Sequence, residues 1–262
     1  MKCVKPGKII NITISKIKKL LPVRIKNIIG TLRGFIYCVI YLGKGRYCPV
    51  CSKQFRKFGK SGVDQRNNAK CLKCGSLERH RLIWLYFTKV SDLFDGKPKK
   101  VLHIAPEFCF EERLKKRIAT GYITADFNDP GAMIKMNITD INYPDESFDV
   151  ICCSHVLEHV VDDIGAIREL HRVLKKSGWA VILVPIMGER TFEDFSIIDP
   201  DERLKVFGQE DHVRIYGRDF VDRLKKGGFE VKVIAPSDFL NNDEILQMGI
   251  SAESGEIYYC TK

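Results

Sequence analysis

From residue 100 onward, short apolar runs alternate with longer segments in which apolar residues recur every three or four positions. Short apolar runs are typical of buried parallel strands, and the longer periodic segments are typical of helices. The alternation predicts an α/β fold with a Rossmann-like, doubly wound sheet. Seven strands are predicted, at residues 100–104, 122–126, 134–138, 148–153, 179–185 and 229–234, with 256–261 closing an edge.

Two predicted helices carry end signals. Residues 163–175 follow Asp162, which suits an N-cap, and they precede Gly178, which we expect to terminate the helix. Residues 218–226 lead into Gly227 and Gly228 in the same way. The first helix places its apolar residues on one face, as covering a sheet requires: Ile164, Ile167, Leu170 and Leu174.

The front of the chain has a different pattern. Residues 9–42 repeat apolar positions with Lys and Arg between them, which is typical of basic amphipathic helices, and Pro22 interrupts the pattern. One interpretation is a peripheral membrane anchor or a nucleic-acid contact, and the other is a solvated helix packed on its own protein. The apolar run 35–42 is far shorter than the ~20 residues that cross a bilayer, so no transmembrane span is predicted.

The charge distribution separates the two halves. The chain has 262 residues, 45% of them hydrophobic and 29% charged, which is ordinary globular usage. Residues 1–46 hold eleven Lys or Arg and no acidic residue, and residues 47–100 hold thirteen basic against four acidic residues. Residues 101–262 hold nineteen basic and twenty-nine acidic residues. The basic half suits a polyanion or an anionic membrane surface, whereas the acidic remainder is typical of an enzyme domain.

Two cysteine pairs predict a metal site. The segments Cys48-Pro-Val-Cys51 and Cys71-Leu-Lys-Cys74 are nineteen residues apart, a spacing at which two tight turns present four thiolates to one tetrahedral ion. Zinc suits four sulfur ligands, and a closed four-ligand site has no open position, so the predicted role is structural. We therefore expect a small N-terminal zinc ribbon with four cysteine ligands. With no signal peptide recognised before these pairs, a reducing, cytoplasmic location is expected.

Polar residues follow the first four predicted strands, where ligands bind in such sheets. Asp126 follows the second strand and suits the hydroxyls of a ribose, while Asn137 and Ile138 suit an adenine. The segment His103-Ile-Ala-Pro-Glu107 follows the first strand, and Ser154 with His155 follows the fourth. A dinucleotide is disfavoured, because the Gly-x-Gly-x-x-Gly pattern that approaches its pyrophosphate is missing.

Three motifs carry a family resemblance: Tyr143-Pro-Asp-Glu-Ser-Phe-Asp-Val150, Ser154-His-Val-Leu-Glu-His159 and the run 167–178. They resemble the fourth and fifth motifs of the type 11 group of class I S-adenosylmethionine-dependent methyltransferases. The run 211–217 and the ribbon together resemble a bacterial subgroup with this two-part layout.

The resemblance implies which residues bind S-adenosyl-L-methionine. It places the methionine part at His103, Ala105, Pro106 and Glu107, the ribose at Asp126 and the adenine at Asn137 and Ile138, with Ser154 and His155 at the reactive end. Two departures stand out. The first loop lacks the usual glycines, and Asn137 replaces a common aspartate, although its side-chain oxygen can still accept a hydrogen bond.

The expected organisation has four parts. A basic amphipathic helical segment covers residues 1–46, the zinc ribbon 47–81, a linking helix 82–98 and the methyltransferase domain 99–262. The segment from His155 to His159 also matches the His-x-x-Glu-His pattern of zinc peptidases. That pattern belongs within a regular helix, whereas here it follows directly on a strand, which argues against a peptidase.

The transfer needs an aligned acceptor and, for a hydroxyl or ring nitrogen, a general base. His155 and His212 are the candidate catalytic residues, although His155 is equally well interpreted as a histidine that caps its turn. The insertion 187–216 is expected to receive a polar or anionic acceptor through four side chains: Arg190, Arg203, Arg214 and Tyr216.

Three functions remain open at this point. The leading one is methyl transfer to a small-molecule or glycan-type acceptor, including a membrane-associated one if the basic front contacts lipid. An RNA methyltransferase would use the basic zinc-ribbon half to hold nucleic acid through its phosphates. A non-catalytic zinc-binding interaction module is the third, because the first loop lacks glycine.

Overall fold

The computed structural model describes residues 39–62 and 65–262. Residues 1–38 of the basic helical segment predicted for residues 1–46 lie outside the described residues. Residues 42–46 of that segment belong to the strand β1 (Leu42–Cys48), so the helical prediction is wrong there. Within the described residues, none of the helices has the length and apolar character that crossing a membrane requires.

A seven-stranded sheet forms the centre of the protein, in the order β12-β13-β9-β8-β5-β6-β7. Neighbouring strands are parallel from β9 to β7, and β13 is antiparallel to both of its neighbours. The predicted Rossmann-like, doubly wound sheet is thus confirmed. The strands are β5 (Val101–Ile104), β6 (Tyr122–Asp126), β7 (Ile134–Lys135), β8 (Phe148–Ser154), β9 (Leu174–Leu183), β12 (Glu230–Ile234) and β13 (Ile257–Thr261).

The last strand is not at the edge, contrary to the prediction. β13 lies between β12 and β9, and β12 forms the edge. The burial of the two strands explains this order. β13 buries Ile257, Tyr258 and Cys260 on both faces of the sheet, whereas four of the five residues of β12 are at least partly exposed.

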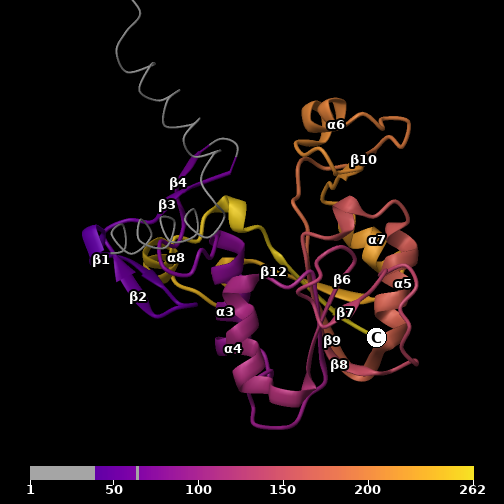
Figure 1. The fold of residues 1–262 in the computed structure, drawn as a ribbon, viewed down its shortest axis with the longest axis horizontal. Helices are drawn as coiled ribbons and strands as arrows, with labels where there is room; N and C mark the ends of the chain where they lie inside the picture. The colour runs from indigo at the N-terminus through magenta and orange to yellow at the C-terminus, as the bar shows by residue number, and fades with distance from the viewer. Residues whose placement is uncertain (1–38, 63–64) are drawn as a thin grey trace, which may run out of the picture.

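Helices cover both faces of the sheet (Figure 1). Alternate strand residues point to opposite faces, so Val101, Val150 and Val181 share a core with α3 (Glu78–Lys89) and α4 (Phe108–Ile118). The intervening residues pack with α5 (Asp163–Val173) and α7 (Phe220–Lys226) on the other face. Shorter elements complete this part: η1 (Ala119–Gly121), η2 (Leu157–His159), η3 (Pro236–Asp238), α8 (Asn242–Met248) and η4 (Ala252–Ser254).

The helix α5 ends earlier than expected. Asp162 caps it as predicted, accepting the Gly165 N–H at 2.9 Å, but β9 begins directly after Val173. Gly178 therefore does not terminate the helix. It lies within β9, where a Cβ atom would come to 2.6 Å from the Asp149 carbonyl oxygen, so glycine permits the close approach of two strands. The predicted stop at Gly227 and Gly228 does follow α7.

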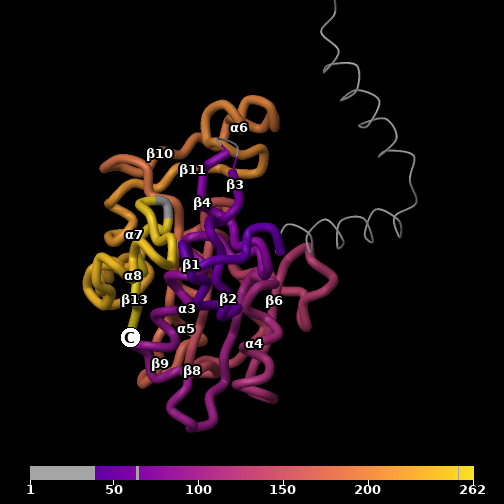
Figure 2. The backbone as a smooth tube through the Cα atoms, turned by 90° about the vertical axis from the view of Figure 1, so that its left-hand side faces the viewer, coloured from indigo at the N-terminus to yellow at the C-terminus, as the bar shows by residue number. Residues whose placement is uncertain are grey.

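Two hairpins carry the cysteine pairs. They consist of β1 (Leu42–Cys48) with β2 (Lys53–Phe55), and β3 (Gly59–Ser61) with β4 (Arg66–Lys70). The helix α3 follows them and spans 78–89, and α8 returns from the C-terminal part to pack beside β1 (Figure 2). The cysteine hairpins are thus held between the linking helix and the end of the chain.

The insertion forms a lobe above the carboxyl ends of the strands (Figure 1). It contains β10 (Phe192–Glu193), α6 (Pro200–Phe207) and β11 (Arg214–Ile215), with β10 and β11 paired. Its two ends are joined where the Met187 N–H donates to the Tyr216 carbonyl at 2.7 Å. The lobe therefore stands beside the edge at which ligands bind in parallel sheets.

Candidate active site

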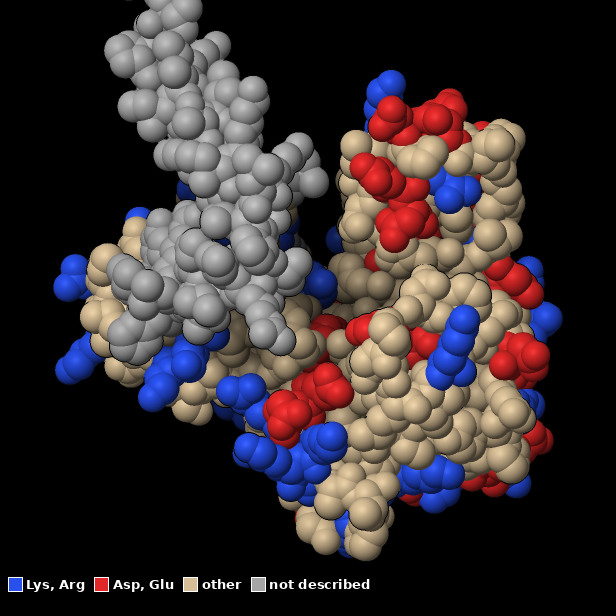
Figure 3. Space-filling view, viewed as in Figure 1, with Lys and Arg blue, Asp and Glu red and all other residues tan. Residues whose placement is uncertain are grey.

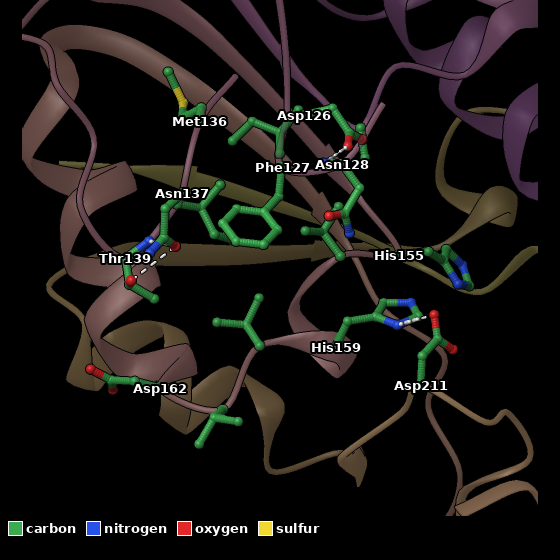
Figure 4. Close-up of a pocket in the computed structure, with 16 residues that line it drawn as sticks. Asp126, Phe127, Asn128, Met136, Asn137, Thr139, His155, His159, Asp162 and Asp211 are labelled. Atoms are coloured by element: carbon green, nitrogen blue, oxygen red, sulfur yellow. Dashed lines mark hydrogen bonds and ion pairs between the residues drawn. The ribbon is translucent and has the colours of Figure 1, made fainter. Parts of the chain in front are cut away.

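A pocket of about 700 Å³ opens at the carboxyl ends of the central strands. This volume lies within the range of ordinary ligand sites. Of the nine residues predicted to bind the cofactor, five line it: Ala105, Asp126, Asn137, Ile138 and His155 (Figure 4). The pocket also sits at the point where the strand order reverses, between β5 and β8.

Asp126 ends β6 and turns the chain into the pocket wall. Its Oδ1 accepts the backbone N–H groups of Asn128 at 2.6 Å and Asp129 at 2.7 Å. These bonds fix the carboxylate and leave Oδ2 for a ligand. A fixed carboxylate oxygen at the end of the second strand suits a ribose hydroxyl.

Asn137 is oriented differently from the expectation. Its side-chain oxygen already accepts the Thr139 N–H at 3.1 Å and the Thr139 hydroxyl at 2.9 Å (Figure 4). The amide nitrogen of Asn137 is therefore the group offered to a base edge, as a donor. Met136 and Ile138, each only 6% exposed, provide apolar walls on the same strand end.

The first loop adopts a glycine-like conformation without glycine. Ala105 has φ 47°, in the left-handed region that favours glycine, and its N–H donates to the Ala125 carbonyl at 2.8 Å. His155, at the end of β8, has φ 56°, and its N–H donates to the Leu183 carbonyl at 2.8 Å. Such strain concentrates at functional sites, and here it affects the two strand ends that flank the switch point.

His103 faces the interior and does not line the pocket, contrary to the prediction. It is fully buried, with Nδ1 at 2.7 Å from the Tyr122 hydroxyl and Nε2 at 2.7 Å from Glu107 Oε2. Strand alternation explains this, because His103 lies on the face that Phe110 of α4 covers. Pro106, Glu107 and Ser154 also lie outside the set of lining residues.

Glu107 is an anionic group next to the first loop. Burial alone would raise its pKa, but the hydrogen bond from His103 and the nearby His80 outweigh burial and lower the pKa to about 2. Its Oε1 is buried and has no hydrogen-bond partner. Glu107 is therefore an anion paired with His103 and His80 outside the lining of the pocket.

The four ribbon cysteines converge. Their sulfur atoms all lie within 4.8 Å of one another, with Cys48 at 3.6 Å from Cys74 and Cys51 at 3.7 Å from Cys71. Two sulfurs bound at about 2.3 Å to a tetrahedral zinc ion are about 3.8 Å apart. The residues present therefore fit a tetrahedral metal ion held by four thiolates.

The two candidate bases lie in one polar cluster. His155 lines the pocket, and its Nδ1 is 3.2 Å from Glu158 Oε1. His212 is 4% exposed and packs behind His159, with ring centroids 4.6 Å apart. The segment from His155 to His159 forms a strand end and the single turn η2, so it lacks the regular helix of the peptidase pattern.

Arg214 and Tyr216 are structural rather than open to an acceptor. The Arg214 guanidinium is fully buried and donates to the carbonyls of Leu157 and Val161 and to the carboxylate of Glu193. The Tyr216 hydroxyl donates to Asp163 at 2.8 Å. These contacts attach the insertion to the turn after β8, which sequence position alone did not indicate.

Sequence reasoning missed part of the pocket wall. The additional lining residues include Phe127, Asn128, Thr139, Val160, His159 and Asp211, which the tertiary structure brings together. His159 and Asp211 form an ion pair, with His159 Nδ1 at 3.1 Å from Asp211 Oδ2 (Figure 4). Both residues belong to motifs quoted above, but no local pattern links the two motifs.

Residues 105–182 match the family model described as a methyltransferase domain. They belong to a methyltransferase domain. This match confirms the family resemblance of the sequence motifs. The methyltransferase domain includes Asp126, Asn137 and His155, whereas Asp211 and His212 lie beyond the matched residues.

Similar proteins include an uncharacterized protein of Methanocaldococcus jannaschii, 33% identical over 75 residues, which are 27% of this chain and 33% of that protein. The chain thus matches about a third of the length of this curated relative. An S-adenosylmethionine-dependent methyltransferase of Mesorhizobium loti is 14% identical with a TM-score of 0.49, covering 69% of this chain and 98% of that one. One of Archaeoglobus fulgidus is 15% identical with a TM-score of 0.46, covering 71% and 95%.

Proposed function

We propose that this protein is an S-adenosylmethionine-dependent methyltransferase whose pocket between β5, β6, β7 and β8 binds the cofactor. The observation that carries the proposal is Asp126, held by two backbone N–H groups with Oδ2 left at the pocket, inside a methyltransferase domain. Asp126 would bind the ribose and Asn137 the adenine edge. The apolar Met136 and Ile138 would enclose the base.

When bound, the cofactor supplies a methyl group attached to a sulfonium sulfur. The bond between the methyl carbon and sulfur would break as the acceptor atom bonds to that carbon, and S-adenosylhomocysteine would be released. The protein aligns the acceptor and removes its proton. His155 is the base we propose, since it lines the pocket and Glu158 Oε1 lies 3.2 Å from its Nδ1. The adjacent carboxylate would stabilise the imidazolium that accepts the proton.

The charge of the insertion favours a small-molecule or glycan-type acceptor over RNA. Residues 187–216 hold eight acidic and four basic residues, and Figure 3 shows acidic side chains gathered on this lobe. RNA phosphates would be repelled there, although the ribbon side is basic. We therefore propose an acceptor without a phosphate backbone. For the ribbon we propose a structural zinc ion bound by Cys48, Cys51, Cys71 and Cys74.

Calorimetric titration with S-adenosylhomocysteine tests the cofactor. The unmodified protein should bind saturably, and Asp126→Ala should weaken binding by roughly 100-fold, as expected for a lost charged hydrogen-bond acceptor. Asp129→Ala is the matched control, because that carboxylate accepts only the N–H of Gly131 in the same turn. Absence of binding to folded, zinc-loaded protein would favour the non-catalytic module instead.

A further inference from the structure

Two segments far apart in sequence meet at the edge of the pocket. The turn η2 carries Glu158 and His159, the loop before β11 carries His212, and each residue offers one ligand atom within 4.8 Å of the other two. The Val213 N–H donates to the Glu158 carbonyl at 3.0 Å, so the two backbones are joined directly beside these side chains. The cluster is therefore part of the fold rather than a chance approach of surface groups.

Glu158 lacks the partners that a buried carboxylate requires. The residue is fully buried, and neither carboxylate oxygen has a hydrogen-bond partner. His155 Nδ1 lies 3.2 Å from Oε1, and that contact is an ion pair only when His155 is protonated. Arg79 also acts electrostatically on this carboxylate. A buried anion in this setting is stabilised by a bound cation.

His212 presents an unused nitrogen to the same place. Its ring forms a hydrogen bond with the Phe207 backbone, while its buried Nε2 has no partner. A histidine that binds a metal typically uses one ring nitrogen for the ion and donates the other to a carbonyl or carboxylate. His159 has the corresponding arrangement, with Asp211 Oδ2 at 3.1 Å from its Nδ1.

Buried contacts hold both segments in place. The Arg214 guanidinium, immediately beyond this loop, donates to the carbonyls of Leu157 at 2.9 Å and Val161 at 2.8 Å on either side of η2. The Tyr216 hydroxyl, which donates to Asp163 at 2.8 Å, also lies 3.3 Å from the Leu157 carbonyl oxygen. A rigid surrounding of this kind keeps ligand side chains in one geometry.

We propose that Glu158, His159 and His212 bind a divalent transition-metal ion such as zinc. One carboxylate and two imidazoles are the donor set of many open zinc sites and of related first-row metal sites, which leave coordination positions free. Since His159 and Asp211 line the pocket, the free position faces it. Given the proposed methyl transfer, an oxygen or nitrogen atom of the acceptor would occupy that position.

This site differs from the ribbon and from the peptidase pattern. The ribbon offers four sulfurs and is closed, whereas the new site offers oxygen and nitrogen and is open. The peptidase pattern uses both of its histidines as ligands, whereas here His155 is replaced by His212 from the insertion.

Metal content after reloading with zinc tests the proposal on the full chain. The unmodified protein should hold a second equivalent of zinc beyond that of the ribbon, and His159→Gln and His212→Gln should each lose it. His171→Gln is the matched control, since this histidine of α5 packs against Phe229 and is not one of the three proposed ligands, so both equivalents should remain. His159 is 31% exposed, so its substitution should leave the fold intact, which near-ultraviolet circular dichroism would verify.

Cobalt substitution separates the two sites, because only the ribbon gives intense thiolate charge-transfer absorption. Loss of the weaker absorption of cobalt bound by nitrogen and oxygen in the two histidine variants, with the thiolate bands retained, supports the proposal. Zinc bound by the ribbon alone, or two equivalents retained in both variants, would overturn it. Titration of the same samples with S-adenosylhomocysteine reports on the proposed methyltransferase function separately, since cofactor binding does not use these ligands.

Discussion

The guanidinium of Arg81 in α3 donates to the Met248 carbonyl at 2.6 Å and to the Gly249 carbonyl at 2.8 Å, at the end of α8. The same buried side chain donates to the carbonyls of Ala69 and Ser76, each at 2.9 Å, in the ribbon. One arginine therefore connects the cysteine hairpins, the linking helix and the C-terminal part of the chain.

Replacing Arg81 with methionine should destabilise the whole protein by roughly 3 kcal/mol or more, because several buried carbonyls lose a charged donor. Urea unfolding followed by circular dichroism measures the change. Arg46→Met is the control, since Arg46 donates to the Leu246 carbonyl at 2.8 Å in a solvent-exposed hydrogen bond, and its loss should cost less than about 1 kcal/mol. Equal losses of unfolding free energy in the two variants would contradict the structural role of the buried Arg81 side chain.

Removing the zinc ion proposed for the ribbon should lower the melting temperature of the entire chain. Ligand thiolates without their ion repel one another, and the ribbon is linked to the sheet domain through Arg81. Differential scanning calorimetry with and without a strong chelator measures the shift. An unchanged main transition after verified zinc loss would show that the ribbon folds without its metal.

The Ala105→Gly substitution should stabilise the protein by up to about 1 kcal/mol, or leave its stability unchanged. Ala105 has φ 47°, and glycine relieves the strain of that conformation. Ala125→Gly is the matched control. Ala125 accepts the Ala105 N–H from the neighbouring strand, and glycine there should cost roughly 1 kcal/mol. Thermal unfolding measures the stability of the two variants. If Ala105→Gly destabilised the protein as much as Ala125→Gly, backbone strain at Ala105 would be ruled out.

Stability should fall as the pH drops from about 6.5 towards 4. Burial lowers the pKa of His80 from its ordinary value of 6.5 to about 4, so between these values the unfolded chain binds a proton that the folded protein does not. Proton binding by the unfolded chain thus lowers the free energy of unfolding as the pH falls through this window, by up to about 3 kcal/mol. Glu107 adds to this loss of stability only below pH 4.5, the ordinary pKa of its carboxyl group.

Urea unfolding at pH 7 and at pH 4.5 measures this dependence. The variant His80→Gln removes the titrating group and should reduce the difference between the two pH values. Its stability at pH 7 should fall, because His80 Nδ1 accepts the Leu77 N–H at 3.1 Å. An unchanged pH dependence in the variant would assign the effect to another group.

Local patterns determined much of this protein. Apolar periodicity placed all seven sheet strands, and the spacing of Cys48, Cys51, Cys71 and Cys74 indicated their convergence, because both signals act over a few residues or a short loop. Asp126 was identified from its position after the second strand, since carboxyl ends of parallel strands share one edge of a sheet.

The tertiary structure decided what depends on long-range packing. Strand alternation turned His103 inward, burial on both faces placed β13 inside the sheet, and internal carbonyls used up the donors of Arg214. The meeting of Glu158 and His159 with His212 joins segments more than fifty positions apart. The sequence by itself determines which residues of each element are apolar, polar or chemically able to bind a metal, whereas the packing of distant elements decides which side chains share a site.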